Sequence, residues 1–461
     1  MTARLTPFKA GARDILGLPL LLGLAATTQA DIDPMARMTA VTQDISEATN
    51  GRLNLSGYIN GHYMTHDGLP DLVNKHLNHA LWQIREASLF ADVVITDSLL
   101  FSTELEMSYS FTDKEHSGRK DSFEALLNYY YFDFDVSNAL GWDTDEVGAL
   151  HIRAGRVLVP FLSYNENKPN FKQNLMSQPF TAWQLAPVNN VAIDFQQFGW
   201  TDLGAILNWN YAFDEAGLFD VKFSVINGLG TKSAVLDNNT VQLNSPGMMK
   251  PTVRPRDGLV NARSDWDEFS DVNDEPALVL KASFVPAAIP LNIGVSWYQG
   301  AWDKEGDHDL TMVGVHLDYL QRNWNIKGEY VEADVEQQAG INVVSAMGPA
   351  MINVSTGDYT MSSWYLEGAY VPFRYGSDNE KFLKTIIRLD EVDTNDKALF
   401  TPFDRERLTL GLEWNFMHNI RLRYEWQRHK IHDFDNAPGP YIAAGGEEEV
   451  TMNMISLIAH F

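Results

Sequence analysis

The sequence predicts an all-β fold, a transmembrane antiparallel β-barrel of 16 strands, with 18 strands as the alternative. Three observations support this fold class: an export signal at the N-terminus, a long series of segments in which apolar and polar residues alternate, and a final strand that ends in Phe461. The chain has 461 residues, a length that suits two or three ordinary domains or one large barrel. The alternating pattern decides between them.

The first 30 residues have the features of a cleaved secretory signal peptide. Arg4, Lys9 and Arg13 make a positive start, residues 15–26 form an apolar run, and Ala30 is a small residue at the expected cleavage site. A transmembrane anchor is the alternative, but the apolar run is too short for one. No later stretch is apolar enough for a spanning helix, so we expect an exported protein without helical membrane spans.

Alternation with a period of two is clearest in residues 98–111. The apolar and aromatic side chains of this segment share one face with a single Thr: Leu99, Phe101, Thr103, Leu105, Met107, Tyr109 and Phe111. The opposite face is mostly polar and includes Glu104 and Glu106. Because a strand sends alternate side chains to opposite faces, this pattern predicts a strand with one apolar side, long enough for a tilted membrane strand of roughly 9–11 residues.

The same pattern recurs more than a dozen times, in strands longer than those of most soluble sandwiches. A closed barrel in lipid pairs every backbone group and leaves no edge. We expect strands that start near residues 52, 84, 98, 122, 149, 194, 218, 276, 290, 310, 323, 359, 381, 404, 419 and 450. The sixth is the hardest to place, because Gly199 and Gly204 blur residues 194–213. That segment is one long bulged strand or two, which leaves 18 strands open.

Connections alternate between short turns and long loops, as they do in outer-membrane barrels. The long loops are expected at residues 65–81, 160–192, 228–275, 336–358 and 432–449. Short turns are expected in the periplasm, and an even strand number places both chain ends there. We divide the chain into a signal peptide (1–30), a short periplasmic segment (31–51) and the barrel (52–461). The amphipathic last strand, ending in Phe461, resembles the insertion signal of bacterial outer-membrane barrels.

A barrel of 16 strands is wide enough to hold a water-filled channel, and its inward residues set selectivity. The period assigns these pore-lining residues: Glu104, Glu106, Glu124, Lys327, Glu329, Lys384, Arg388, Arg407, Arg421 and Arg423. Lys222, Lys281, Asp390, Glu413 and Glu425 also point inward. One hypothesis sets a basic wall from strands thirteen to fifteen against an acidic wall from strands three and four, which makes a transverse field. In the alternative, these charges pair laterally and keep the lumen wet.

The segment 160–192 follows the fifth strand and is long, rich in Asn and Gln, and interrupted by three Pro residues. We expect it to fold into the barrel as a constriction loop, with Tyr164, Glu166, Lys168 and Lys172 near the narrowest point. The alternative is an ordinary surface loop. Deleting the segment separates the two, because only a constriction loop limits conductance.

Composition excludes several functions. The chain has 61 acidic and 35 basic residues, a net charge of −26, and no Cys, so we expect no nucleic-acid partner and no thiol-based metal or redox site. Acidic runs such as 265–275 and 303–309 read as solvated loop charge; the alternative is divalent-cation bridging to lipopolysaccharide. No GxSxG, HExxH or P-loop pattern occurs. We expect no catalytic residue, no metal site and no cofactor.

Several fragments resemble the porin family typified by the phosphate-selective porins O and P. They follow the family order and include HIRAGRVLVPF (151–161), FSVINGLG (223–230), IKGEYVEADV (326–335), SSWYLEGAYVPF (362–373) and RLTLGLEWNFMHNIRLRYEWQ (407–427). The resemblance implies a 16-stranded barrel, typically a homotrimer, with its third outer loop folded inward. The family's phosphate specificity depends on many lumenal Arg and Lys residues. This acidic chain departs from that pattern, so only the architecture and passive diffusion are carried over.

Three functions follow as hypotheses. The first is a porin of the Gram-negative outer membrane, in contact with lipid and lipopolysaccharide, through which small hydrophilic solutes or ions diffuse passively. The second is a barrel without transport that acts as a scaffold, an adhesion surface or a sheath for a partner protein. The third is a barrel enzyme. Conductance in planar bilayers separates the first from the others.

Overall fold

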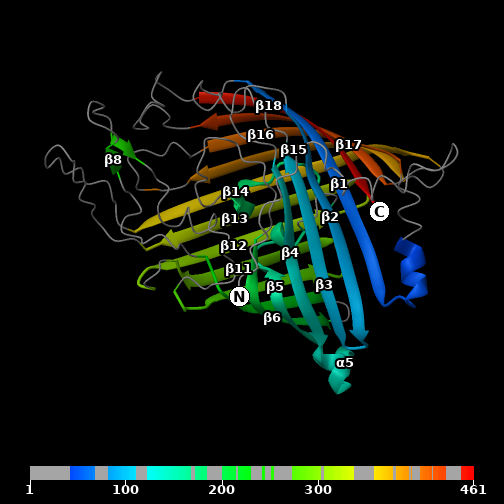
Figure 1. Ribbon diagram of the computed structural model, residues 1–461. Coiled ribbons are helices and arrows are strands. Elements are labelled where there is room, and N and C mark those ends of the chain that lie inside the picture. The colour runs from blue at the N-terminus through cyan, green and yellow to red at the C-terminus, as the bar shows by residue number, and fades with distance from the viewer. Residues whose placement is uncertain are drawn as a thin grey trace.

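The structure is a computed structural model with 16 long antiparallel strands wound into one barrel (Figure 1). It describes residues 42–67, 81–110, 122–167, 172–183, 200–213, 216–229, 241–243, 251–253, 273–302, 306–336, 358–376, 380–393, 396, 405–417, 419–431 and 448–461. The expected signal peptide lies outside the described residues.

Each barrel strand pairs with its two neighbours, and β1 pairs with β18 to close the ring. The barrel strands are β1 (Leu53–Asp67), β2 (Leu81–Thr96), β3 (Leu99–Ser110), β4 (Ser122–Asp135), β5 (Ala149–Leu158), β6 (Thr201–Phe213), β7 (Gly217–Ile226), β10 (Ala277–Pro286), β11 (Leu291–Ala301), β12 (Asp309–Leu320), β13 (Trp324–Val335), β14 (Tyr359–Tyr375), β15 (Lys381–Asp393), β16 (Arg405–Met417), β17 (Ile420–Ile431) and β18 (Glu448–His460). The prediction of 16 strands is confirmed. The alternative of 18 is wrong, because β8 (Val241–Leu243) and β9 (Pro251–Val253) pair only with each other.

The end of the chain completes the closure. Gly57 and Phe461 exchange both backbone hydrogen bonds, at 3.0 and 2.9 Å. A Cβ on Gly57 would meet the Phe461 ring at 2.6 Å, so glycine is what lets the terminal aromatic residue lie against β1. With every strand paired on both sides, the barrel leaves no open edge.

Short turns gather at one end of the barrel and long connections at the other, as the sequence predicts. Between β4 and β5 the short-turn end carries two small helices, α5 (Val136–Leu140) and α6 (Thr144–Val147). Asp135 caps α5 by accepting the Asn138 backbone N–H at 2.9 Å. Before β1, residues 42–48 are helical. Among the described residues, no helix is long and apolar enough to cross a membrane.

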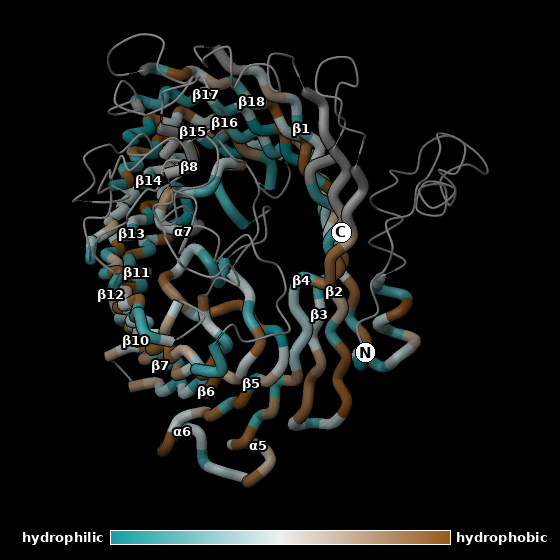
Figure 2. Tube along the Cα trace, turned by 60° about the vertical axis from the view of Figure 1, so that its left-hand side comes forward, coloured by the Kyte–Doolittle hydropathy of each residue, from teal (hydrophilic) through white to brown (hydrophobic). Residues whose placement is uncertain are grey.

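The two faces of the barrel wall differ as the period of two predicts, and Figure 2 shows the resulting alternation along the strands. On β16, the side chains of Leu410, Leu412 and Trp414 are exposed on the outer face, whereas Arg407 and Glu413 are buried on the inner face. Aromatic pairs lie on strands near the short-turn end. Ring centroids are 4.3 Å apart for Trp324–Tyr370, 4.5 Å for Tyr211–Phe213 and 5.1 Å for Trp414–Phe416.

The sixth strand differs from its prediction. The sequence pattern placed its start near residue 194, but β6 begins at Thr201, opposite Leu158 at the end of β5. The ladder stops there because the chain leaves the wall after Leu158. Residues 184–199 lie outside the described residues.

An apolar core also lies inside the barrel, at the long-loop end of β7 and β10–β14. Its buried members include residues of the chain after β5 and inward residues of the wall: Val159, Phe161, Leu162, Trp200, Val279, Tyr298, Met312, Val331, Val335 and Met361. Trp200 contacts both Phe161 and Tyr298, with ring centroids 5.9 and 5.4 Å apart. The mostly polar inner face that the alternation predicted is therefore interrupted by a packed apolar patch.

Candidate functional site

The segment after β5 lies against the inner face of the wall, in contact with inward side chains from β7 to β17. It includes a 3₁₀ turn, η1 (Asn165–Asn167), and a short helix, α7 (Phe180–Trp183). Figure 2 shows α7 within the outline of the barrel, beside β14. We call residues 159–167 and 172–183 the inner segment.

Glu329 on β13 holds the inner segment at two places. Its carboxylate accepts the backbone N–H groups of Ser163 at 2.9 Å and Tyr164 at 2.7 Å, and the hydroxyl of Thr181 at 2.7 Å. A carboxylate that accepts backbone N–H groups away from water satisfies donors that would otherwise be costly to bury. Glu329 thus fixes the start and the end of the inner segment to one strand.

Glu425 on β17 repeats this arrangement further along the segment. It accepts the backbone N–H groups of Met176 and Ser177 and, at 2.9 Å, the hydroxyl of Ser177. The next inward residue of β17, Gln427, donates to the same carboxylate at 3.2 Å. The middle of the inner segment is therefore bound to a strand four positions around the barrel from β13.

Arg388 on β15 links the segment to two carboxylates. Its guanidinium donates to the carbonyl of Ser177 at 2.9 Å and to the hydroxyl of that residue at 2.6 Å. It also pairs with Asp390 at 3.0 Å and with Glu367 at 3.5 Å. Only 1% of Arg388 is exposed, so each of its charged contacts is made with little screening by water.

Arg407 on β16 shares the partner of Arg388. It pairs with Asp390 at 2.9 Å and donates to the carbonyl of Gln178. The Phe180 ring at the start of α7 packs against Arg407 and Arg405, with guanidinium carbons 4.3 and 4.9 Å from the ring centroid. Cations over an aromatic face contribute favourably when they are buried, and here they place α7.

A third group joins β15, β16 and β17. Glu413 pairs with Lys384 at 2.9 Å and with Arg423. Lys384 also donates to Asn174 at 3.1 Å, and Arg423 donates to the carbonyl of Gln173. The cations that were expected to form a basic wall are therefore paired with carboxylates of the same wall or bound to the inner segment.

Glu166 in η1 binds one lysine on β7 and one on β10. Its two carboxylate oxygens contact Lys222 on β7 and Lys281 on β10, and Lys281 also donates to the Leu162 carbonyl at 2.7 Å. Burial favours the neutral acid, but the charges of Lys281 and Lys222 outweigh it and lower the pKa of Glu166 to about 2. The carboxylate is therefore ionised at any physiological pH.

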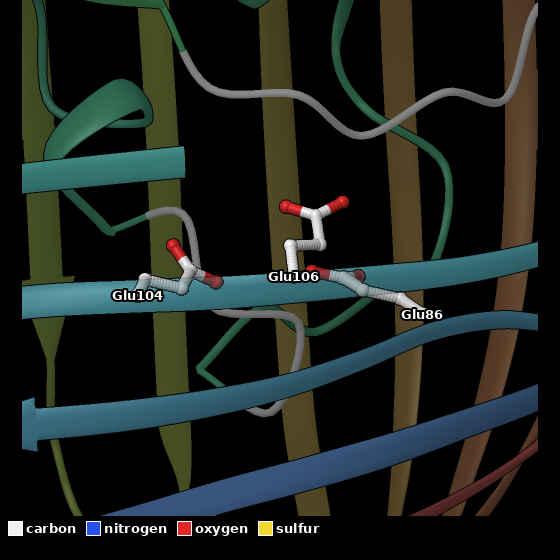
Figure 3. Close-up of side chains that lie close together, drawn as sticks. All are labelled: Glu86, Glu104 and Glu106. Atoms are coloured by element: carbon white, nitrogen blue, oxygen red, sulfur yellow. The ribbon is translucent and has the colours of Figure 1, made fainter. Parts of the chain in front are cut away.

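The remaining side of the inner face, formed by β2 and β3, carries a cluster of three buried carboxylates. One oxygen from each of Glu86, Glu104 and Glu106 lies within 4.8 Å of the others, and Figure 3 shows the three side chains projecting from the two strands into one space. Glu86 accepts the hydroxyl of Tyr58, and Glu104 accepts the Asn128 amide at 2.7 Å. We call these three residues the carboxylate cluster.

The other expected site residues do not form a single group. Tyr164 is buried, and this burial raises the pKa of its hydroxyl. Lys327 donates to Gln173 at 3.5 Å, and Arg421 is half-buried on β17. Lys172 is exposed, so it does not share the buried position of Tyr164. Lys168 and the side chain of Glu124 lie outside the described residues.

Two residues of the site escaped the sequence pattern. Glu86 was missed because the β2–β3 ladder shifts register between Ile84 and Ala87, which breaks the alternation that would have turned it inward. Glu367 lies in a clean alternation on β14, and counting by two from its apolar neighbours would have found it. The backbone groups of the inner segment that bind the wall could not be predicted, because nearly every residue carries the same N–H and carbonyl groups whatever its side chain.

No family model matches the chain. No curated protein matches it either. Among solved structures, it is similar to an anion-selective porin from Comamonas acidovorans, with 12% identity, 89% of this chain and 99% of that chain covered, and a TM-score of 0.49. The outer membrane channel DcaP of Acinetobacter baumannii gives 12% identity, 89% and 97% coverage, and a TM-score of 0.48. OmpF of Salmonella typhi, in complex with daunomycin, gives 10% identity, 89% and 97% coverage, and a TM-score of 0.48. With TM-scores below 0.5, these likenesses add nothing to what the closed barrel itself shows.

Proposed function

We propose that the protein is a porin of the Gram-negative outer membrane, through which small hydrophilic solutes or ions diffuse passively. The observation that carries the proposal is a closed barrel of 16 strands whose long inner segment is bound to one side of the wall. Barrels of this strand number are wide enough to hold an aqueous channel. A segment tied to β7–β17 narrows such a channel.

The outer face supports the membrane location. Large hydrophobic side chains are exposed on it along nearly every strand, as with Val295, Val313, Leu366 and Ile387, each about half exposed. Soluble proteins do not expose an apolar band that runs around the molecule, whereas a barrel in lipid requires one. The aromatic pairs near the short-turn end fit the interfacial girdle of such barrels on the periplasmic side. The outer face as a whole would contact lipid and, in the outer leaflet, lipopolysaccharide.

The cargo that we propose is not phosphate. In the phosphate-selective porins that the sequence resembles, free lumenal cations carry the specificity. Here Arg388, Arg407 and Arg423 are each paired with a buried carboxylate. Such pairs have little charge left for an anion in transit, so we propose general diffusion limited mainly by solute size.

A homotrimer is part of the proposal, because the resemblance implies it. The mass of the folded protein in detergent tests it directly. A particle with three chains supports the trimer, and a single-chain particle rejects it without affecting the channel.

Swelling of proteoliposomes tests the proposed function. The full chain is reconstituted, and the vesicles are diluted into isotonic sugars of increasing size. We expect fast swelling with the smallest sugars and a rate that falls with solute size, because passage is limited by the width beside the inner segment. Protein-free vesicles and vesicles with heat-denatured protein are the controls. Folded protein that gives no swelling above the controls contradicts the proposal and favours the barrel without transport.

A further inference from the structure

The carboxylate cluster is an electrostatically expensive arrangement. Glu86, Glu104 and Glu106 are at least 95% buried, with exposures of 2%, 2% and 5%, and their oxygens lie within 4.8 Å of one another. Carboxylates this close, in a site of low dielectric constant, repel one another unless a positive charge is shared among them. The cluster alone does not say which charge that is.

A second observation comes from the neighbouring strand. Asn60 on β1 is directly opposite Glu86 in the β1–β2 ladder, so the two side chains share the inner face. Asn60 is fully buried, and within the part of the chain that the structure describes neither its amide nitrogen nor its amide oxygen has a hydrogen-bond partner. Buried polar groups in folded proteins are rarely left without a partner, and such a group often marks an ion or water that completes the site.

Glu86 connects the strand that carries Asn60 to the cluster. Tyr58, two residues before Asn60 on the same face of β1, donates to this carboxylate. Both ladders that flank Glu86 shift register beside it, after Asn60 on one side and between Ile84 and Ala87 on the other. Register shifts of this kind re-aim side chains, and here the Tyr58 hydroxyl of β1 meets the carboxylates of β2 and β3.

The chemistry of the oxygens selects the ion. Ca²⁺ takes six to eight oxygen ligands from carboxylates, amide carbonyls and water, at about 2.3–2.6 Å. Ligands of one Ca²⁺ ion lie up to about 4.6–5.2 Å apart, so three oxygens that are all within 4.8 Å of one another can share a single ion. Mg²⁺ demands a stricter octahedron and keeps several of its waters, so a site made mainly of protein oxygens suits it less well.

We propose that Glu86, Glu104 and Glu106, together with the amide oxygen of Asn60, bind one Ca²⁺ ion on the inner face of the barrel. The ion neutralises the crowded carboxylates and ties β1, β2 and β3 together where the inner segment makes none of the contacts described above. The site does not depend on whether the barrel conducts.

Calorimetric titration with CaCl₂ tests the site in the full-length, detergent-folded protein after dialysis against a chelator. We expect one saturable Ca²⁺ site per chain and weaker binding of Mg²⁺. Glu104→Gln removes one charged ligand and should weaken Ca²⁺ binding at least about tenfold, because ligand charge tunes affinity at such sites. Glu332→Gln, which neutralises an exposed carboxylate on β13, is the matched control and should leave the affinity unchanged.

Asn60 provides a second pair of variants that leave all three carboxylates in place. Asn60→Asp adds a charged ligand and should tighten Ca²⁺ binding, whereas Asn60→Ala removes the amide oxygen and should weaken it. The proposal is overturned if the wild-type protein has no saturable Ca²⁺ site, or if Glu104→Gln and Glu332→Gln bind Ca²⁺ equally well. If Glu104→Gln does not fold, equal affinities for the two Asn60 variants overturn the proposal instead.

Discussion

The two sides of the inner face use buried carboxylates in opposite ways. On the β13–β17 side, Asp390 and Glu413 each bind two cations, and Glu425 binds backbone N–H groups of the inner segment. On the β2–β3 side, three carboxylates crowd together with hydroxyl and amide donors. The first arrangement fixes a segment in place, and the second is suited to attract a positive charge.

The charges on the β13–β17 side therefore contribute to the structure rather than to transport. Side chains whose ion pairs and hydrogen bonds already hold the inner segment are not available to bind a solute, even though they are charged. Selectivity should therefore depend on side chains other than these. Variants on the β13–β17 side should change stability and channel width before they change ion preference.

The largest effect is expected for Arg388→Met. The substitution leaves Asp390 and Glu367 buried without their shared cation and removes the donors that bind Ser177. Breaking a buried ion pair from one side costs about 3–5 kcal/mol. Unfolding of the detergent-folded protein by guanidinium, followed by tryptophan fluorescence, measures the loss. A loss below about 1 kcal/mol would mean that water replaces the guanidinium and that the site is not dry.

Glu329→Ala comes second. It leaves the backbone N–H groups of Ser163 and Tyr164 without an acceptor, at roughly 2–4 kcal/mol for two buried donors. The released inner segment should also make single-channel currents larger and noisier. Glu332→Ala, three residues along the same strand and exposed, is the control. Equal currents in both variants would show that Glu329 does not hold the segment at the constriction.

A smaller effect with a defined pH range is expected for Glu166. Its pKa in the folded protein, about 2, is lower than the ordinary value of 4.5. The ionised carboxylate therefore stabilises the fold fully above pH 4.5, and this contribution is lost as the pH falls towards 2. The difference in melting temperature between wild type and Glu166→Gln should be constant from pH 7 to about 4.5 and should shrink below that. A difference already gone at pH 4.5 would contradict the ion pairs with Lys222 and Lys281.

The smallest effect is expected for Arg428→Met. Its partner Glu449 is about half exposed, as Arg428 itself is, and exposed pairs are screened by water and salt. We expect the same melting temperature as wild type within error. A loss similar to that of Arg388→Met would remove the contrast between buried and exposed pairs on which this ranking depends.

The alternation of residues predicted the barrel almost completely. Strand positions and the facing of Arg388, Arg407, Glu413 and Arg423 depend only on a period of two, which each strand carries in its own sequence. The β6 start was wrong because the ladder ends where β5 ends, at Leu158, and this is a property of two strands rather than one.

The pairing of the charges was not predictable from the sequence in the same way. The contacts of Ser177 with Arg388 and Glu425 join residues 211 and 248 positions apart, and no local pattern encodes such a distance. The apolar core inside the barrel was missed for a related reason. In the sequence, inward residues such as Val279 and Met312 resemble the apolar residues of any strand. Only the structure shows that they belong to one buried cluster with Phe161 and Trp200.

Single-channel recording in planar bilayers tests the central claim, that solutes pass through the barrel beside the inner segment. Wild-type protein should insert with discrete conductance steps, and their size should rise roughly in proportion to the KCl concentration, because the ions cross through water. Folded wild-type protein that inserts and remains silent at every salt concentration would contradict the account and leave a barrel closed by its own inner segment.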